Sequence, residues 1–383
     1  MQFDAAVIGG GPVGAAVALE LQAAGLSVLL LEARETRELP GDERPIALSY
    51  GSRLVLERLG VWDRLQDATQ IARIHVSQRG RFGRAVLSAD EARLPALGYV
   101  VNYGTLASVL DSALAEAEAR GGLQVRRGAR VVSMAHDRAS AHILFESRSG
   151  PDECYASVVA VADGNAEAAG VEVRVVQYDQ TALSGRVDTD LPHANTAYER
   201  FTPDGPLALL PCGSGYAVVW VNSPAVAEDL CEAAPTVFLA ALQAAFGDRA
   251  GRFTRVTARA SHRVALRVAA HPTAGRAALI GNSAQALHPV AGQGLNLGLR
   301  DAWEFASEIR KQGPTAPALL EAYEARRRID RFGAIGFTHG VVKIFSNDWS
   351  PVGFARGVGL TLLDNFPPAK DFVIRRMIFG ARG

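Results

Sequence analysis

The sequence has few cysteines and no excess charge of either sign. Only 3 of its 383 residues are Cys, and Cys154, Cys212 and Cys231 stand far apart without a Cys-x-x-Cys spacing. Neither a disulfide framework nor a metal site is therefore predicted, and a reducing, cytoplasmic setting is expected. Because 40 Lys and Arg residues are balanced by 40 Asp and Glu residues, nothing in the charge favours binding to nucleic acid.

The sequence also lacks long apolar runs. No window approaches the ~18 consecutive apolar residues of a spanning helix, and no basic segment precedes the apolar residues 5–8 at the N-terminus. Neither a transmembrane helix nor a signal peptide is therefore predicted. At roughly 150 residues per domain, the length predicts two or three structural units.

The hydrophobic patterns predict an α/β fold. Residues 5–8, 15–24 and 28–31 form a β-α-β unit, and helical periodicity returns at residues 105–119 and 295–309. Short alternating runs interrupted by Gly and Pro indicate a separate β-rich region. We predict a Rossmann-like domain with a parallel sheet (1–70, 98–175 and 261–330), a β-sheet-rich domain (71–97 and 176–260) and a short helical C-terminal region (331–383).

A glycine-rich turn in the first β-α-β unit predicts a dinucleotide site. Gly9, Gly11 and Gly14 follow the first strand in the spacing G-x-G-x-x-G, and Glu32 ends the next strand. The first glycine permits the tight turn, the second lets a pyrophosphate approach, and the third lets helix and strand pack closely. The helix N-terminus would face the phosphates and Glu32 the ribose hydroxyls.

Two later stretches favour a flavin. Residues 158–164 read as a buried strand that ends in Asp163-Gly164, which by itself is also an ordinary turn. Residues 278–302 read as a strand, a polar turn and a glycine pair before a helix that starts near Leu295. A helix N-terminus reached through small residues suits the anionic edge of a reduced flavin.

These motifs resemble those of the group A FAD-dependent aromatic hydroxylases. The glycine fingerprint, Asp163-Gly164 and the block from Gly281 to Asn296 match that family's three fingerprints in order. The version Asn-Ser-Ala-Gln-x-Leu-His-Pro, with residues 44–48 and 200–211, is similar to the ubiquinone-biosynthesis branch, above all to hydroxylases of 2-polyprenyl-6-methoxyphenol.

The resemblance implies a set of FAD-binding residues and leaves the catalytic side chains unassigned. The implied set is Gly9, Gly11, Pro12, Val13, Gly14, Glu32, Ala33, Arg34, Arg44, Val131, Asp163, Gly164, Gly281, Asn282, Pro289, Gly292, Gln293, Gly294, Leu295 and Asn296.

The chain departs from the family pattern in two places. After Asp163-Gly164 the family has Ser and then Arg, whereas this chain has residues 165–170 as Asn-Ala-Glu-Ala-Ala-Gly. Since that segment is thought to serve NAD(P)H as well as FAD, the departure concerns the reductant site. Asn282 stands where the family has Asp, which keeps a hydrogen-bonding group and removes a charge.

Several single residues have two interpretations. His288 lies in a turn beside Pro289, which favours a structural role over catalysis; Arg44 either contacts the cofactor or pairs with neighbouring acids. Tyr216 and Trp220 share one strand face and favour a core. The run 326–328 (Arg-Arg-Arg) predicts a solvated helix face.

The end of the chain alternates apolar and basic residues. The segment 370–382 carries four basic residues and one acid among large apolar side chains. It predicts either packing against the protein or peripheral contact with an anionic membrane, on its inner, cytoplasmic face.

The resemblance implies the hydroxylation of a polyprenylated phenol in ubiquinone biosynthesis. NAD(P)H would reduce FAD, and O₂ would react to a C4a-hydroperoxyflavin that transfers oxygen to the ring. A quinone-biosynthesis protein complex is implied as a further partner. The alternatives are a hydroxylase that acts at another ring position of the same pathway, a halogenase or prenyl reductase of this fold, and a non-catalytic scaffold that binds FAD and lipid.

Overall fold

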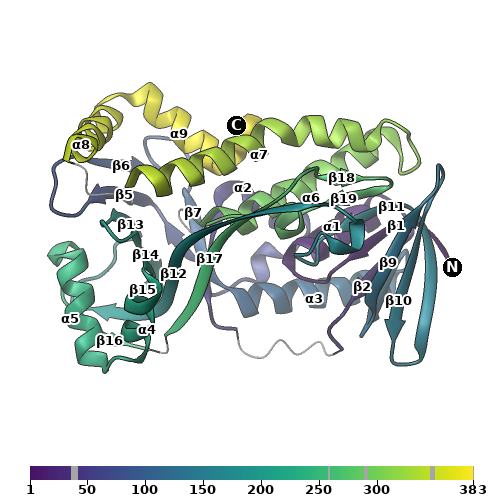
Figure 1. The fold of residues 1–383 in the computed structure, drawn as a ribbon, viewed down its shortest axis with the longest axis horizontal. Helices are drawn as coiled ribbons and strands as arrows, with labels where there is room; N and C mark the ends of the chain where they lie inside the picture. The colour runs from purple at the N-terminus through teal and green to yellow at the C-terminus, as the bar shows by residue number, and fades with distance from the viewer. Residues whose placement is uncertain (36–41, 258, 289–291, 346–349, 383) are drawn as a thin grey trace.

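The computed structural model describes residues 1–382 except 36–41, 258, 289–291 and 346–349. Figure 1 shows a first sheet with its helices at one end of the molecule, a second sheet at the other end, and the C-terminal helices along one side. The predicted α/β class, with a parallel sheet, a β-rich second region and a helical C-terminal region, is confirmed.

The first sheet is parallel at its centre. Strand β1 pairs in parallel with both β2 and β11, and β8 and β19 extend the parallel order at the two sides. An antiparallel extension is formed by β9 and β10. The strands are β1 (Gln2–Ile8), β2 (Val28–Glu32), β8 (Leu123–Arg127), β9 (Arg130–His136), β10 (Ala141–Ser147), β11 (Gly150–Val161), β18 (Thr273–Ala274) and β19 (Ala277–Leu279).

The helices that share a hydrophobic core with this sheet include α1 (Pro12–Ala23), α3 (Tyr103–Arg120) and α6 (Gln293–Gln312). Helix α1 begins with Gly11 as N-cap and a proline in its first turn, an arrangement typical of helix starts. Its buried alanines keep its surface narrow, so that it packs against both α3 and α6.

The second sheet is mostly antiparallel and has one covered face. Helices α4 (Pro224–Glu232) and α5 (Pro235–Phe246) follow one another, and α5 packs with the large apolar side chains of β15 in a separate core. The strands are β5 (Arg73–Gln78), β6 (Arg84–Ser88), β12 (Val173–Thr189), β13 (Thr196–Phe201), β14 (Pro206–Cys212), β15 (Gly215–Asn222), β16 (Phe253–Val256), β17 (Ala260–Ala269) and β20 (Gln285–Ala286).

A small third sheet and helix α2 connect the two regions. Strand β7 (Gly98–Asn102) pairs with β3 (Pro45–Ser49) and with β4 (Thr69–Ile71), and α2 (Tyr50–Arg58) follows β3 directly. The chain therefore passes from the first sheet to the second through β3, α2 and β4.

The C-terminal region forms helices α7 (Leu319–Phe345), α8 (Ser350–Asn365) and α9 (Pro367–Phe379). Prolines mark two of the helix starts, because Pro351 lies at the start of α8 and Pro367 begins α9. Proline is tolerated in the first turn of a helix, where its missing N–H has no intrahelical partner.

The division into domains stays a prediction, and four elements cross its boundaries, the first being β4 at residue 70. Strand β12 begins at Val173, before the boundary at residue 175, and α7 runs through the boundary at residue 330. Strand β17 pairs with β12 in the second sheet, although residues from 261 onward were assigned to the first domain. Long strands that serve both regions hide such boundaries from the sequence.

Candidate active site

One cavity of about 870 Å³ lies at the carboxyl ends of the parallel strands and is also lined by the second sheet. In α/β folds, ligands bind outside the carboxyl ends of parallel strands. Most of the predicted cofactor residues line it: Gly9, Gly11, Pro12, Val13, Glu32, Ala33, Arg34, Arg44, Val131, Asp163, Gly164, Asn282, Gly294 and Leu295.

The three glycines of the turn between β1 and α1 differ in what a Cβ atom would meet at each position. Gly9 has φ +98°, and a Cβ there would lie 2.6 Å from the backbone of Asp163. At Gly14 a Cβ would lie 1.9 Å from the carbonyl oxygen of Gly9. At Gly11 nothing lies within 4 Å, so this glycine leaves open the space in front of the helix N-terminus.

Glu32 is a buried carboxylate at the end of β2. Its oxygens accept hydrogen bonds from the backbone N–H of Gly10 (2.6 Å) and of Arg34 (2.8 Å), and from the Arg34 guanidinium (3.0 Å). Burial opposes its ionisation, but these bonds and the Arg34 charge together lower its pKa below the usual 4.5. Glu32 is therefore an ionised acceptor at the edge of the cavity.

Asp163 and Gly164 at the end of β11 are held by the turn after β19. The Ser283 hydroxyl donates to Asp163 Oδ1 (3.2 Å) and accepts from the Gly164 N–H (2.9 Å). Burial raises the pKa of Asp163. The backbone N–H of Asn165, where the chain departs from the family pattern, donates to Asp163 Oδ1 (2.9 Å), so the turn closes without the family's Ser and Arg.

Helix α6 begins at the cavity. Its N-cap Gly292 has φ 58°, and a Cβ on Gly294 would meet nothing within 4 Å. The predicted helix is present, but it begins at Gln293 instead of Leu295, so that Gly292 is its N-cap and Gly294 lies inside its first turn. Pro289 lies outside the described residues.

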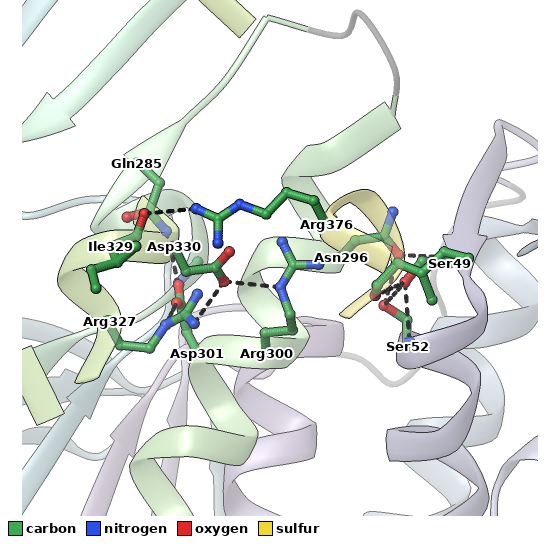
Figure 2. A network of polar contacts seen from close by, with 12 residues as sticks. Ser49, Ser52, Gln285, Asn296, Arg300, Asp301, Arg327, Ile329, Asp330 and Arg376 are labelled. Carbon is green, nitrogen blue, oxygen red and sulfur yellow. Dashed lines mark hydrogen bonds and ion pairs between the residues drawn. The ribbon is translucent and has the colours of Figure 1, made fainter. Parts of the chain in front are cut away.

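Two predicted residues of α6 do not line this cavity. Gln293 and Asn296 line a second, much smaller apolar cavity of about 70 Å³ between β3 and α9. Asn296 accepts hydrogen bonds from the Ser49 N–H and the Ser52 hydroxyl (both 2.7 Å) and donates to the carbonyl oxygen of Ala47 (2.9 Å), as Figure 2 shows in part. Its side chain thus ties α6 to β3 and α2.

Gly14 and Gly281 do not line the cavity, but they contact the segments that do. Gly14 packs α1 on the turn, while Gly281 is buried and donates its N–H to Asp301 Oδ2 (3.0 Å). The next residue, Asn282, is exposed and lines the cavity.

Arg44 matches both of its interpretations. It lines the cavity, and it forms an ion pair with Asp42 at 2.6 Å. Its guanidinium also lies 5.2 Å from the ring centroid of Tyr103, another cavity residue. Asp42 therefore holds Arg44 against the cavity wall.

His288 is buried, and its Nε2 lies 3.3 Å from Gln180 Oε1. Its ring packs edge-on against Tyr178. Burial lowers its pKa to about 4, so the imidazole is neutral at neutral pH. These contacts agree with the structural role that the sequence favours.

The second sheet supplies cavity residues that no motif indicates. They include Ala182, Ser184, Val219, His262 and Val264. The alternation of β12, β15 and β17 puts them on the face opposite α5, but a strand pattern alone does not say which face meets a ligand. Tyr216 and Trp220 are buried on the α5 side, as predicted.

The prediction for residues 326–328 is wrong for Arg327. This side chain is 4% exposed and donates to Asp301 Oδ1 (2.6 Å) and to Asp330 Oδ2 (2.8 Å), while Arg300 also donates to Asp330 (3.1 Å). Figure 2 shows this network between α6 and α7. Since Asp301 also accepts from Gly281, the buried charges support the turn that presents Asn282.

The comparisons with known proteins decide the family. Residues 2–331, most of the chain, match the family described as FAD binding domain. The chain belongs to this family of FAD-dependent hydroxylases. It is 32% identical to ubiquinone hydroxylase UbiL of Rhodospirillum rubrum over 97% of this chain and 88% of the relative. It is also 32% identical to 3-demethoxyubiquinol 3-hydroxylase of Escherichia coli, over 93% of each chain.

Solved structures agree on the fold. Superposition on p-nitrophenol 4-monooxygenase PnpA from Pseudomonas putida DLL-E4 gives a TM-score of 0.76 at 18% identity, over 100% of this chain and 99% of that chain. The flavin-dependent brominase Bmp2 gives the same TM-score at 15% identity, over 100% and 94%. At these identities the likeness shows the fold alone. With the family match, the predicted kinship with group A FAD-dependent hydroxylases is confirmed.

The cavity of this FAD-dependent hydroxylase fits its cofactor. Its volume lies in the range of about 300–1,000 Å³ typical of ligand sites. The open space at Gly11 in front of α1 suits the phosphates, ionised Glu32 suits the ribose hydroxyls, and the start of α6 at Gly294 suits the flavin edge. The family uses NAD(P)H as reductant.

Proposed function

We propose that this protein hydroxylates the aromatic ring of a polyprenylated phenol, 2-polyprenyl-6-methoxyphenol, in ubiquinone biosynthesis. NAD(P)H and O₂ are the co-substrates, and bound FAD supplies the oxygen-transfer chemistry by way of the C4a-hydroperoxide implied by the resemblance. The observation that carries the proposal is the near full-length similarity to hydroxylases whose names place them in ubiquinone synthesis.

The chain's own residues have positioning roles in this reaction. The turn at Gly9 and the carboxylate of Glu32 hold the dinucleotide, and the buried Asp301 keeps the Gly281 turn in place. The apolar residues of β12 and β15 close the cavity opposite these groups and keep water away from the reacting ring.

The test is product formation by purified protein. The FAD-loaded enzyme is given NADPH, ¹⁸O₂ and a short-chain 2-prenyl-6-methoxyphenol, and the product is examined by mass spectrometry and NMR. One ¹⁸O atom on the ring is expected, coupled to NADPH oxidation. NADPH oxidation without labelled product from any prenylated phenol of the pathway would refute the proposal.

A second ring position is the alternative that one comparison favours. The Escherichia coli relative is named 3-demethoxyubiquinol 3-hydroxylase. Its name gives position 3 of a demethoxyubiquinol as the ring position that is hydroxylated. Offering both substrates in one reaction and locating the label by NMR separates the two functions.

We also propose a peripheral contact with an anionic membrane, through α8 rather than through the basic segment 370–382. Helix α9 buries Lys370, Ile374 and Ile378 against the protein, and Lys370 pairs with Glu91. No helix among the described residues is long and apolar enough to cross a membrane.

The outward side of α8 is apolar. Its exposed residues include Phe354, Val358 and Leu362, and Phe366 follows at its end. Phe354 packs edge-on against the exposed Phe82, and the neighbouring loop carries the exposed Arg79. Apolar side chains flanked by Arg suit the interface of an anionic bilayer.

Vesicle flotation tests this contact. Since an exposed Phe or Leu gains about 1.5–3 kcal/mol on burial, the double variant Phe354→Ser/Leu362→Ser is expected to bind phosphatidylglycerol vesicles at least about 10-fold more weakly. Val237→Ser on α5 is the matched control. Equal binding of wild type and double variant would contradict the contact.

A further inference from the structure

A row of side chains crosses the face of the second sheet that lies opposite α5. Ser184 of β12 pairs with Val219 of β15, Val219 with Ala208 of β14, Ala208 with Glu199 of β13, and Glu199 with Val76 of β5. Residues paired across neighbouring strands point to the same face. Since Ser184 and Val219 line the large cavity, the row begins at the cavity wall.

The residues of the row are partly buried. All five residues keep accessible surface, whereas Leu183, Leu209 and Val218, on the α5 side of the same strands, are fully buried. At about 4.8 Å between strands, Glu199 lies roughly 10 Å beyond Val219. The intervening residue is Ala208, whose side chain is a single methyl group.

Glu199 is the one acid in this row, and its surroundings are apolar. It is flanked across the strands by Val76 and Ala208, and along its own strand by the buried Ala197 and Phe201. Its Oε1 is buried without a hydrogen-bond partner among the described residues. Burial alone raises its pKa to about 7.

A buried carboxyl oxygen of this kind is expected to have a hydrogen-bond partner when the protein is bound to its ligand. An unpaired buried polar atom costs about 1–3 kcal/mol, so most are satisfied by protein or ligand. The neighbouring Arg200 points to the other face, where it contacts Ser77 and the ring of Phe246. Asp188 on β12 pairs with Arg255. Glu199 differs from these groups because its Oε1 has no such partner among the described residues and because it shares a sheet face with the cavity residues Ser184 and Val219.

We propose that Glu199 is a catalytic residue that binds the phenol hydroxyl of the substrate and accepts its proton. The proposal rests on the proposed function. The O–H bond breaks, the proton moves to the Glu199 carboxylate, and the electron pair remains on the phenol oxygen. That pair is delocalised into the ring, which enriches the ortho and para carbons in electrons for attack by an electrophilic oxygen.

The residues beyond Glu199 suit the apolar tail of the same substrate. Ile74 lies two residues before Val76 on the same face of β5, and its partner on β6 is Leu87. Both line the small cavity with Met377 and Ile378 of α9. A ring held at Glu199 thus has the large cavity on one side and an apolar cluster on the other.

The decisive variant is Glu199→Gln, which keeps the shape and removes the base. FAD affinity is expected to stay within about twofold, while kcat/KM for the prenylphenol falls at least about 100-fold, the usual range for a general base. Wild-type kcat/KM should rise with pH through about 7 as Glu199 ionises. In Glu199→Gln that rise should be replaced by one that follows the ionisation of the phenol itself.

Glu228→Gln, an exposed acid on α4, is the matched control and should leave every readout unchanged. Glu199→Asp restores a carboxyl group and should recover part of the pH profile, which a merely structural role would not predict. If Glu199→Gln does not fold, Glu199→Asp is the variant used for the same measurements.

Binding is measured separately from turnover, by the change in the flavin spectrum as the phenol or its O-methyl ether is added. Wild type should prefer the phenol at least about 10-fold, since a hydrogen bond to a charged group is worth about 1.5–3 kcal/mol, and Glu199→Gln should lose the preference. The binding preference can be measured even if no phenol is hydroxylated. The absence of hydroxylation would refute the proposed function and would leave the role of Glu199 in binding to be judged from the preference. Unchanged preference and pH profile in the variant would overturn the role of Glu199.

Discussion

The two walls of the cavity are built in different ways. One wall consists of strand ends, glycine turns and helix starts, where the backbone itself faces the ligand. The other is the face of a sheet, where alternate side chains such as Ser184 and Val219 face it. Close backbone contact with a ligand restricts the residue type to glycine, so this wall can be recognised in the sequence as a motif. A sheet face accepts many side chains, so the other wall has no sequence motif.

The largest expected effect is on the backbone-built wall. In Gly14→Ala the new Cβ would lie 1.9 Å from the Gly9 carbonyl oxygen. Overpacking of about 1–3 kcal/mol or more should open the turn, so the purified protein should retain almost no FAD. Gly336→Ala, in an open position on α7, is the control and should retain FAD. A yellow, stoichiometric Gly14→Ala protein would show that the turn tolerates a side chain.

Next in size is the support behind that wall. Asp301→Ala removes the acid that pairs with Arg327 and accepts from Gly281. Removing one of the two acids that pair with the buried Arg327 should lower the free energy of unfolding by about 3–5 kcal/mol, measured by urea denaturation. The exposed pair of Arg375 and Asp371 provides the comparison, because Asp371→Ala should cost about 1 kcal/mol or less. Equal losses would mean that the buried network contributes little.

A substitution in the sheet-built wall should lower kcat/KM for the substrate and leave FAD affinity unchanged. Ala208→Leu fills the row between Val219 and Glu199. A displacement of the ring by about 1 Å can cost about 100-fold, so kcat/KM for the prenylphenol should fall by that order while FAD affinity is unchanged. Ala208→Ser adds little volume and should remain near wild type. A fall in FAD affinity as large as that in kcat/KM would erase the distinction between the walls.

The smallest effect concerns Glu32. Glu32→Gln replaces a charge-assisted hydrogen bond to the ribose, and FAD affinity should weaken about 10-fold at pH 7. Because the pKa of Glu32 lies below the usual 4.5, the carboxylate's contribution to stability is complete above 4.5 and is lost as the pH falls through the lower value. Urea denaturation between pH 3 and 7 should show this slope in wild type and a weaker one in Glu32→Gln. Glu35→Gln, an exposed acid nearby, is the control.

The sequence was informative where local backbone geometry decides the residue. The glycine turn, the strand before Asp163 and the helix after Gly292 lie where they are expected, because tight turns and helix starts restrict residue types within a few positions. It was uninformative about Arg327 and Asn296. Both contact partners in other elements, and no short-range pattern distinguishes a buried, paired polar side chain from a solvated one.

By itself, the sequence determined the α/β class, the family, the FAD cofactor and one wall of the cavity, since these depend on motifs read within single segments. Only the tertiary structure decided which face of the second sheet meets the cavity, that α8 turns several large apolar residues outward, and that Glu199 Oε1 has no hydrogen-bond partner among the described residues. The physical reason is that burial and pairing belong to contacts between segments far apart in the chain, and strand alternation offers two equivalent faces until packing chooses one.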